Sequence, residues 1–428
     1  MHYVIIGAGP AGINAAEQLR KLDAGARISV FGDEPEAPYS RMALPYYLIG
    51  QVGENGTYLR KTPDHFERLS IDIRRLRVEQ IDGPGKCLKL ANGETIAFDK
   101  LLIASGSRPV APPIPGIDLP GIYNCWTLAD GRKIAEQLKP RARIVLMGAG
   151  FIGCIILEAL VKSGAQLTVV EMGERMVPRM MNEKAGGLIK QWCLEKGVAI
   201  HTGTKIIAFE SDRKGLRVKL DTGEMLSADF VVSAVGVKAN IDFLQGSGIA
   251  TEHGILVDRH LETNVSGVFA AGDAAQGLDF STGEYTVQAI QPTAVEHGLL
   301  VAKNMAGGRE VLHQGNINMN VLDTMGLIAC SFGLWMGVER GSSVERYNPD
   351  RYRYLNLQFQ EDRLIGATAV GLTQHVGVLR GLIQSRIKLG DWKQRLIDDP
   401  TRIMEAYLAN TQAIGINAGV NVKPKKSS

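Results

Sequence analysis

Two segments of the chain contain glycines at the spacing G-x-G-x-x-G, one at residues 7–12 and one at residues 148–153. In this spacing the first glycine permits a tight turn, the second lets the backbone approach a pyrophosphate, and the third allows a helix to pack closely on a strand. The pattern therefore predicts two dinucleotide sites. The residues expected to contact the dinucleotides are Gly7, Gly9, Pro10, Ala11 and Gly12 at the first turn, and Gly148, Gly150, Phe151, Ile152 and Gly153 at the second.

An acidic residue follows each turn at the end of the next β-rich run. Asp33 and Glu34 follow residues 28–31, and Glu171 follows residues 166–170. A carboxylate at this place accepts a hydrogen bond from an adenosine ribose. Because Glu171 would also repel a 2′-phosphate, the second site favours NADH over NADPH. Arg175 weakens this preference if it faces the nucleotide, and has no effect on it if it faces solvent.

These groups require a particular order of secondary structure. Each turn must follow a strand and precede an apolar-faced helix, and the sequence provides that order in residues 3–34 and again in residues 143–171. Repetition of one cofactor-binding unit is the simplest explanation. The predicted fold class is therefore α/β, with two Rossmann-like dinucleotide-binding domains followed by a C-terminal α+β domain.

Composition along the chain suggests where the domains begin and end. Residues 108–116 are rich in proline, which excludes a helix or a central strand there and favours a linker. Further elements are expected as strands at 215–220 and 230–235, a helix at about 293–305, short strands over 316–369 and helices over 376–409. The predicted domains are residues 1–112 with 245–315, residues 113–244, residues 316–412 as an interface domain, and residues 413–428 as a flexible tail.

Charge and hydropathy exclude several classes of protein. Lys and Arg number 48 against 45 Asp and Glu, and the formal charge of +3 is too small for a nucleic-acid partner. Apolar runs are all interrupted well before the ~20 residues that a membrane span requires. The N-terminus has neither the basic region nor the cleavage site of a signal peptide, so we expect a cytoplasmic protein.

The cysteines and histidines have no spacing typical of a reactive pair or a metal site. The eight histidines are dispersed, and no His/Cys cluster matches metal-ligand spacing. The five cysteines form no CxxC or CxxxxC pair. We therefore predict no metal and no redox-active disulfide. The cysteines are Cys87, Cys125, Cys154, Cys193 and Cys330.

Over about residues 1–310 the chain resembles the pyridine-nucleotide-disulfide oxidoreductase superfamily. Residues 33–41 resemble the FAD-binding segment of the branch that contains ferredoxin reductases, rubredoxin reductases and nitrite reductase flavin domains. Residues 101–106 resemble its strand-end "ATG" segment, and residues 263–273 its second FAD motif. Residues 235–240 resemble the segment beside the nicotinamide nucleotide, with Ala239 in place of the usual proline.

The resemblance assigns FAD to the first turn and NAD(H) to the second, with NADP less favoured. It implies that Asp33 and Glu34 hold the adenosine ribose, that Arg41 pairs with the pyrophosphate, and that Asp273 binds the ribityl chain. A helix beginning near residue 292 would direct its positive end at the flavin. The further contacts implied are Val78, Ala104, Gly106, Gly272, Pro292 and Ala294 for FAD, and Gly236 for NAD.

Two positions depart from the family pattern. Tyr46 stands where the branch usually has a lysine, five residues after Arg41. Ile155 stands where the family commonly has a glutamate near the nicotinamide and flavin. Because Ile155 cannot fill a polar role, either another side chain orients the nicotinamide or hydride transfer is slower in this chain. We expect that Ile155→Glu would retain FAD.

The missing cysteines narrow the chemistry that the resemblance implies. Disulfide reductases of the superfamily carry CxxxxC soon after the second strand, and its NADH oxidases and peroxidases carry a single cysteine there. This chain has no cysteine before Cys87. No catalytic side chain is predicted, because the flavin itself would carry the chemistry of an NAD(P)H-linked FAD oxidoreductase and pass electrons to an external carrier. His297 is a possible proton partner, although a packing or surface role is favoured.

Three hypotheses on function remain open. The chain also resembles FAD subunits of multi-subunit oxidoreductases, such as those serving phenylglyoxylate dehydrogenase or tungsten aldehyde oxidoreductase, which would make it an electron-transfer subunit for an iron-sulfur protein or subunit. The alternatives are a free-standing ferredoxin or rubredoxin reductase, and a non-enzymatic flavin-binding sensor or assembly protein. The assembly would be a homodimer or a hetero-oligomeric complex. The basic residues 380–408 provide either a docking face for an acidic carrier or a solvated helix face.

Overall fold

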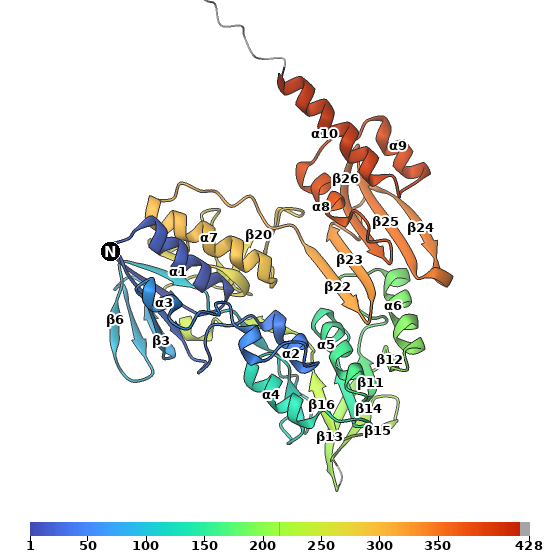
Figure 1. The fold of residues 1–428 in the computed structure, drawn as a ribbon, viewed down its shortest axis with the longest axis horizontal. Coiled ribbons are helices and arrows are strands. Elements are labelled where there is room, and N and C mark those ends of the chain that lie inside the picture. The colour runs from blue at the N-terminus through green and yellow to red at the C-terminus, as the bar shows by residue number, and fades with distance from the viewer. Residues whose placement is uncertain (214, 420–428) are drawn as a thin grey trace, which may run out of the picture. The chain divides into compact units, whose positions relative to one another are not determined.

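The computed structural model describes residues 1–213 and 215–419, with side chains described as far as residue 411. The chain forms two compact units (Figure 1). The first unit comprises residues 1–170 and 204–316, and the second comprises residues 171–203 and the chain from residue 317 onward. The three domain boundaries expected from the sequence remain predictions.

The first unit contains a parallel five-stranded sheet with the order β19-β7-β1-β2-β3. Strands β1, β2, β7 and β19 are largely apolar and buried, as expected for a sheet covered on both faces, whereas the edge strand β3 is mostly polar and only its first residue is buried. Helix α1 (Pro10–Leu22) begins directly after β1, and α7 (Gln291–Gly307) lies beside α1 (Figure 1). The strands are β1 (His2–Ile6), β2 (Arg27–Gly32), β3 (Ile71–Arg75), β7 (Lys100–Ile103) and β19 (Val268–Ala270).

A second parallel sheet in the same unit repeats this arrangement. Strand β10 (Arg143–Met147) lies between β11 (Gln166–Glu171) and β16 (Phe230–Ser233), and β16 also pairs with β9 (Ile122–Asn124). Helix α5 (Phe151–Lys162) begins after the second glycine turn. Both predicted Rossmann-like folds are therefore present.

Smaller elements complete the first unit. Strand β8 (Ser107–Pro109) pairs with β17 (Val237–Ala239), so the proline-rich segment begins as one strand of a two-stranded ribbon. Two antiparallel sheets have the orders β4-β5-β6 and β13-β14-β15, and one mixed sheet has the order β18-β20-β21. Strand β14 has the predicted bounds. The elements are β4 (Val78–Asp82), β5 (Cys87–Leu90), β6 (Thr95–Ala97), β13 (Ile206–Asp212), β14 (Gly215–Leu220), β15 (Met225–Ala228), β18 (Ile255–Leu256), β20 (Ala275–Leu278), β21 (Tyr285–Val287), α2 (Leu44–Leu48), α3 (His65–Arg68) and α4 (Leu128–Gln137).

The second unit is built on an antiparallel five-stranded sheet with the order β22-β23-β26-β25-β24. The predicted change from short strands to helices after residue 370 is present. Helix α10 (Ile403–Gly419) includes the first part of the segment predicted as a tail, and residues 420–428 lie outside the described residues. The elements are β22 (Met319–Thr324), β23 (Leu327–Gly333), β24 (Ser342–Asn348), β25 (Arg353–Gln360), β26 (Arg363–Val370), α6 (Glu183–Glu195), β12 (Ala199–Thr202), α8 (Val376–Ser385) and α9 (Asp391–Asp398).

Candidate cofactor site

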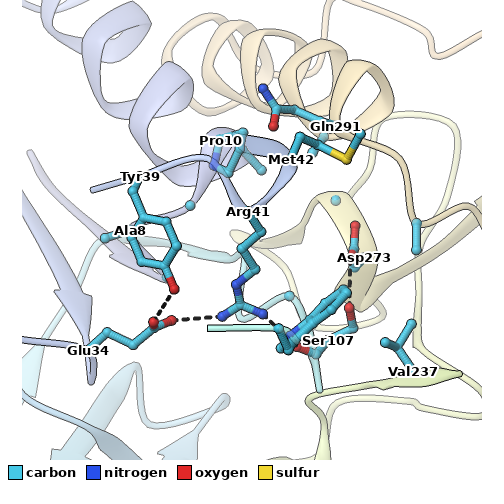
Figure 2. A pocket seen from close by; sticks show the side chains of 18 of the residues that line it. Ala8, Pro10, Glu34, Tyr39, Arg41, Met42, Ser107, Val237, Asp273 and Gln291 are labelled. Carbon is cyan, nitrogen blue, oxygen red and sulfur yellow. Dashed lines mark hydrogen bonds and ion pairs between the residues drawn. The ribbon is translucent and has the colours of Figure 1, made fainter. Parts of the chain in front are cut away.

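A cavity in the first unit is lined by residues from both Rossmann-like folds (Figure 2). The lining includes the first glycine turn, the loop after β2 and the start of α2. It also includes the first two turns of α5, against which α2 packs. The strand ends after β7 and β19 and the start of α7 complete the lining. Segments far apart in the sequence therefore converge on one enclosed space, as is usual at the carboxyl ends of parallel strands.

The first glycine turn has the geometry that a pyrophosphate requires. Gly7 has a φ of +108°, which L side chains rarely adopt. A Cβ at Gly12 would lie less than 3.0 Å from the Gly7 carbonyl, whereas a Cβ at Gly9 would meet nothing within 4 Å. Gly7 and Gly12 are therefore required for the fold of the turn, while Gly9 leaves its backbone open to a ligand.

Glu34, just after β2, is held by two donors. The Arg41 guanidinium donates to one carboxylate oxygen at 2.7 Å, and the Tyr39 hydroxyl donates to the other (Figure 2). Tyr39 is buried, and burial raises the pKa of its hydroxyl above the usual value, so this group remains a donor. The acidic position predicted from the sequence is thus fixed in place by its own loop.

Arg41 extends from this loop to the opposite side of the cavity. It donates to the Ser107 carbonyl at 3.1 Å, and its guanidinium carbon lies 5.0 Å from the centre of the Trp126 ring. Trp126 donates to the same carbonyl at 2.8 Å. The guanidinium is therefore oriented by a carboxylate, a carbonyl and an aromatic face, with donors of its fork left to bind an anion.

Asp273, at the start of the short turn after β19, also faces the cavity. One carboxylate oxygen accepts a hydrogen bond of 2.6 Å from the Ser107 hydroxyl. Desolvation raises the pKa of Asp273 above the ordinary value, and the Ser107 hydrogen bond and the Arg41 charge oppose this shift. The site therefore holds a carboxylate that gains from a further hydrogen-bond donor.

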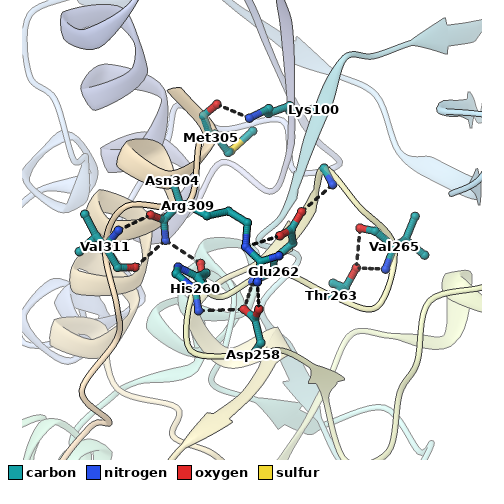
Figure 3. Close-up of polar contacts among 11 residues, drawn as sticks. Lys100, Asp258, His260, Glu262, Thr263, Val265, Asn304, Met305, Arg309 and Val311 are labelled. Carbon is teal, nitrogen blue, oxygen red and sulfur yellow. Dashed lines mark hydrogen bonds and ion pairs between the residues drawn. The ribbon is translucent and has the colours of Figure 1, made fainter. Parts of the chain in front are cut away.

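A polar network supports the segment that leads to Asp273 (Figure 3). Arg309 contacts both Asp258 and the buried Glu262, and Glu262 accepts from the Gly267 amide at 2.7 Å. Asn304 is fully buried and donates to two backbone carbonyls, each at 2.9 Å. Because a buried polar group without partners is costly, these bonds favour one conformation of the loop before β19.

The second glycine turn repeats the backbone of the first. Gly148 has a φ of +99°, and a Cβ at Gly153 would again approach the carbonyl of the first glycine within 3.0 Å. Gly150 has nothing within 4 Å of its Cβ position, and neither has Gly236. The same backbone opening is therefore present twice.

The side chains beyond the second turn are apolar where they line the cavity. Phe151, Ile152 and Ile155 on α5 are partly exposed to it, and Ile156 is almost completely buried. Their spacing places them on one face of the helix. Position 155, where the sequence departs from the family pattern, thus belongs to the cavity wall.

Glu171 and Arg175 lie in the second unit. Glu171 is buried and accepts a hydrogen bond of 2.7 Å from the Gly173 amide. Arg175 donates to the carbonyls of Met181 and Pro178, at 2.8 and 3.2 Å. The guanidinium therefore already binds the backbone of its own loop.

The comparisons with known proteins give the family. Residues 1–298 match the model of the pyridine nucleotide-disulphide oxidoreductases, which covers more than half of the chain. The chain belongs to this family. The predicted superfamily, the oxidoreductase class and the cofactors FAD and NAD(H) are thereby confirmed.

Individual relatives agree with this assignment. The chain is 32% identical over 412 residues to the epsilon subunit of NADH-dependent phenylglyoxylate dehydrogenase from Aromatoleum evansii, which covers 96% of this chain and 97% of that subunit. It is 31% identical over 275 residues to the ferredoxin reductase component of chlorobenzene dioxygenase from a Cupriavidus species, covering 64% and 67%. A NAD-dependent persulfide reductase from A. fulgidus has a similar structure, with a TM-score of 0.85 and 28% identity over 91% of this chain and 78% of that one.

The residues present fit the FAD that the family uses. The opening at Gly9, the oriented guanidinium of Arg41 and the carboxylates at both ends of the cavity match a dinucleotide with two phosphates and several hydroxyls. The roles of single residues remain predictions. Those that line the cavity are Gly7, Gly9, Pro10, Ala11, Asp33, Glu34, Arg41, Ala104, Gly106, Gly272, Asp273 and Ala294 from the FAD set, and Phe151 and Ile152 from the NAD set.

The other predicted residues do not line this cavity. Gly12 and Gly153 pack against backbone of their own turns, Gly148 packs against the Ala234 carbonyl after β16, and Gly150 and Gly236 face open space. Val78 is buried in β4 and Pro292 begins α7. Glu171 lies in the other unit.

Sequence reasoning missed several residues of the cavity wall. Tyr39 lies within the FAD-like segment and could have been noticed there. Ser107, Trp126 and Gln291 gave no signal, because only the folding of distant segments brings them to the cavity. Gln291 accepts a hydrogen bond of 2.5 Å from Ser40, which joins the start of α7 to the Arg41 loop.

The cavity also contains a cysteine that the sequence assigned to packing. Cys125 is buried, and burial raises the pKa of its thiol to about 12, so it is not a reactive thiolate. Within residues 1–213 and 215–419, no group of three His, Cys, Asp or Glu side chains is arranged to hold a metal. No helix in this part of the chain is both long and apolar enough to cross a membrane.

His297 lies behind the Asp273 turn. Its Nδ1 accepts from the Gly272 amide at 3.3 Å, and its Nε2 lies 2.6 Å from the Asn316 side-chain oxygen. Burial, reinforced by the neighbouring His313, lowers the pKa of His297 to about 4. A neutral ring with a fixed tautomer supports the turn, as the favoured packing role requires.

Proposed function

We propose that this chain is the FAD-containing subunit of a larger oxidoreductase, passing electrons between NAD(H) and an iron-sulfur partner. The observation that carries the proposal is the cavity, which is lined by residues of both glycine-turn segments. Burial raises the pKa of the one cysteine in its described lining, Cys125, which disfavours a thiolate there. When bound, FAD accepts a hydride and releases single electrons. Electrons that leave it would go to another protein.

The side chains of the cavity bind and orient rather than react. Arg41 would neutralise the pyrophosphate, and Glu34 would bind the adenosine ribose. Asp273 would accept from hydroxyls of the ribityl chain, which stabilises its ionised form. At the other side of the cavity, the apolar face of α5 excludes water from the position where the nicotinamide must approach.

The extent of sequence similarity to these two relatives supports a subunit. The phenylglyoxylate dehydrogenase subunit matches 96% of the chain, which includes the antiparallel sheet of the second unit, whereas the ferredoxin reductase component matches 64%. A ferredoxin reductase outside a larger oxidoreductase is the second candidate, because that relative is named as the ferredoxin reductase component of a dioxygenase. In the basic residues 380–408 of the second unit, Arg402 is paired with Glu405 and Arg395 lies over Trp392, which supports the alternative of a solvated helix face over a docking face.

Purification of the tagged chain at its native expression level tests the proposal. We expect iron-sulfur proteins to co-purify and NADH to bleach the flavin spectrum of the preparation. A homodimer without such partners that still reduces a one-electron dye would indicate the free-standing reductase. Flavin bands without bleaching by NADH would contradict an enzymatic role. Fractionation of cells tests the cytoplasmic location that belongs to the same proposal.

A further inference from the structure

The cavity has a charged side and an apolar side. Every carboxylate and guanidinium in its described lining comes from residues 33–41 or from Asp273. The lining from α5 consists of Phe151, Ile152, Ile155 and Ile156. The ionic groups therefore belong to the FAD fold, and the wall contributed by the NAD fold is without charge.

The nicotinamide ring of a nucleotide held by the second turn has to reach this apolar wall. Helix α5 begins at that turn, and Ile152 and Ile155 follow on the face that lines the cavity. Because the cavity continues from there to the first glycine turn, a ring that meets the flavin passes these isoleucines. Helix α2, which carries Tyr46, packs against α5. Tyr46 and Ile155 are the two positions that depart from the family pattern, and each has an uncharged side chain where the family commonly has a charged one.

The two redox forms of the ring differ in charge. The oxidised ring is a cation and the reduced ring is neutral. A cation that leaves water for an apolar wall loses hydration, and a nearby anion compensates for this loss more fully than the ring faces of Phe151 and Trp126 in the same lining. The glutamate that the family commonly has at this position would be such an anion, and Ile155 is not.

We propose that Ile155 makes the nicotinamide site selective for the redox state of the nucleotide, so that the neutral reduced ring binds more tightly than the cationic oxidised ring. The proposal rests on the function proposed above and adds to it the direction of electron flow, from NADH to the flavin. NADH would bind well, NAD⁺ formed in the site would leave readily, and the reverse reaction would need a high concentration of NAD⁺.

Binding to the FAD-loaded protein tests this without catalysis. The ligands are NAD⁺ and 1,4,5,6-tetrahydro-NAD, whose ring is neutral and cannot donate hydride, with ADP-ribose as a ligand that lacks the ring. In the unaltered protein the Kd for NAD⁺ should be several-fold larger than the Kd for the tetrahydro form. Ile155→Glu should lower the ratio of the two Kd values by about tenfold, the effect expected for one added charge pair.

Ile155→Gln is the matched control, since it has the size and polarity of glutamate without the charge. Its ratio of the Kd for NAD⁺ to the Kd for the tetrahydro form should stay within about twofold of the ratio in the unaltered protein. ADP-ribose should bind equally to all three proteins. Equal shifts in the Glu and Gln variants would overturn the role of charge. A ratio near one in the unaltered protein would overturn the proposal even if neither variant folds.

The outcome separates this inference from the proposed function. If NADH bleaches the flavin but the ratio is near one, only the selectivity at Ile155 is wrong. If NADH neither binds nor bleaches the flavin, the function proposed above fails and the inference fails with it.

Discussion

The two glycine turns of the first unit have the same backbone and different surroundings. In each, the first glycine has a left-handed φ, the third packs against the carbonyl of the first, and the second faces open space. Beyond the first turn lie a carboxylate fixed by Tyr39 and Arg41, and a second carboxylate at Asp273. Beyond the second turn lies the apolar face of α5.

This difference shows which part of a dinucleotide site is general. The backbone of the turn serves the pyrophosphate, which is common to all dinucleotides. The side chains beyond the turn contact the parts that differ, so they decide which dinucleotide is held and how firmly. A cofactor that stays bound gains from ionic contacts, whereas a substrate that must leave does not need them.

The largest effect is expected from alanine at the third glycine of either turn. Gly12→Ala should abolish FAD binding and lower the melting temperature, because its Cβ would overlap the Gly7 carbonyl. Gly153→Ala should keep FAD but lose the bleaching of flavin by NADH. The measurements are the FAD-to-protein ratio and anaerobic titration with NADH. Gly25→Ala, with open space at its Cβ position, is the control. The same loss in both variants would contradict the division of labour between the turns.

A smaller effect is expected at Arg41, which should matter to FAD alone. Arg41→Ala should weaken FAD binding roughly tenfold to a hundredfold, the range for loss of a charge-assisted hydrogen bond. Arg41→Lys keeps the positive charge but lacks the forked set of donors. Its affinity for FAD should therefore lie between those of the unaltered protein and Arg41→Ala. Equilibrium dialysis of FAD measures the effect. Once FAD is saturating, NADH affinity should be unchanged, and a parallel loss of NADH binding would show that Arg41 serves both nucleotides.

Glu171, the last residue of β11, is predicted from the sequence to affect the choice between NADH and NADPH. Glu171→Gln removes the charge that would repel a 2′-phosphate, so the preference for NADH should fall about tenfold. The measurement is the ratio of kcat/KM values for the two nucleotides. Glu174→Gln changes an exposed carboxylate in the same loop and should leave the ratio unchanged. If the Glu174 variant changes it equally, general electrostatics rather than Glu171 sets the preference.

The smallest effect is expected at Asp273, as a change in stability with pH. A carboxyl group whose pKa is raised in the folded state stabilises the fold at low pH and loses that contribution as the pH rises. Asp273→Asn apoprotein should therefore become more stable than the unaltered apoprotein as the pH rises from about 4 to 7, by a few degrees in melting temperature. The same variant should bind FAD more weakly. Asp72→Asn, at an exposed position, should show neither change. If the Asp273→Asn apoprotein is less stable than the unaltered apoprotein at pH 7, the ionised Asp273 carboxylate does not destabilise the fold as predicted.

The sequence alone determined the parts of the site that depend on local backbone geometry. Glycine spacing, the strand before it, the helix after it and the acid that ends the next strand lie within about thirty residues, so each unit can be recognised without knowing the fold. Strand β14 also has the bounds that the sequence predicted. Resemblance added Arg41 and Asp273, which line the cavity as expected.

Only the tertiary structure decided which side chains meet in the cavity. Ser107, Trp126 and Gln291 come from separate segments, and their convergence depends on the order of strands in the sheets and on the position of α7. The tertiary structure also placed Cys125 in the cavity wall, where burial raises the pKa of its thiol, and it placed Ile155 in the same wall. A one-dimensional pattern records spacing along the chain, whereas the direction of a side chain depends on what packs around its element. For that reason the two dinucleotide sites could be recognised from the sequence, but the difference between their walls could not.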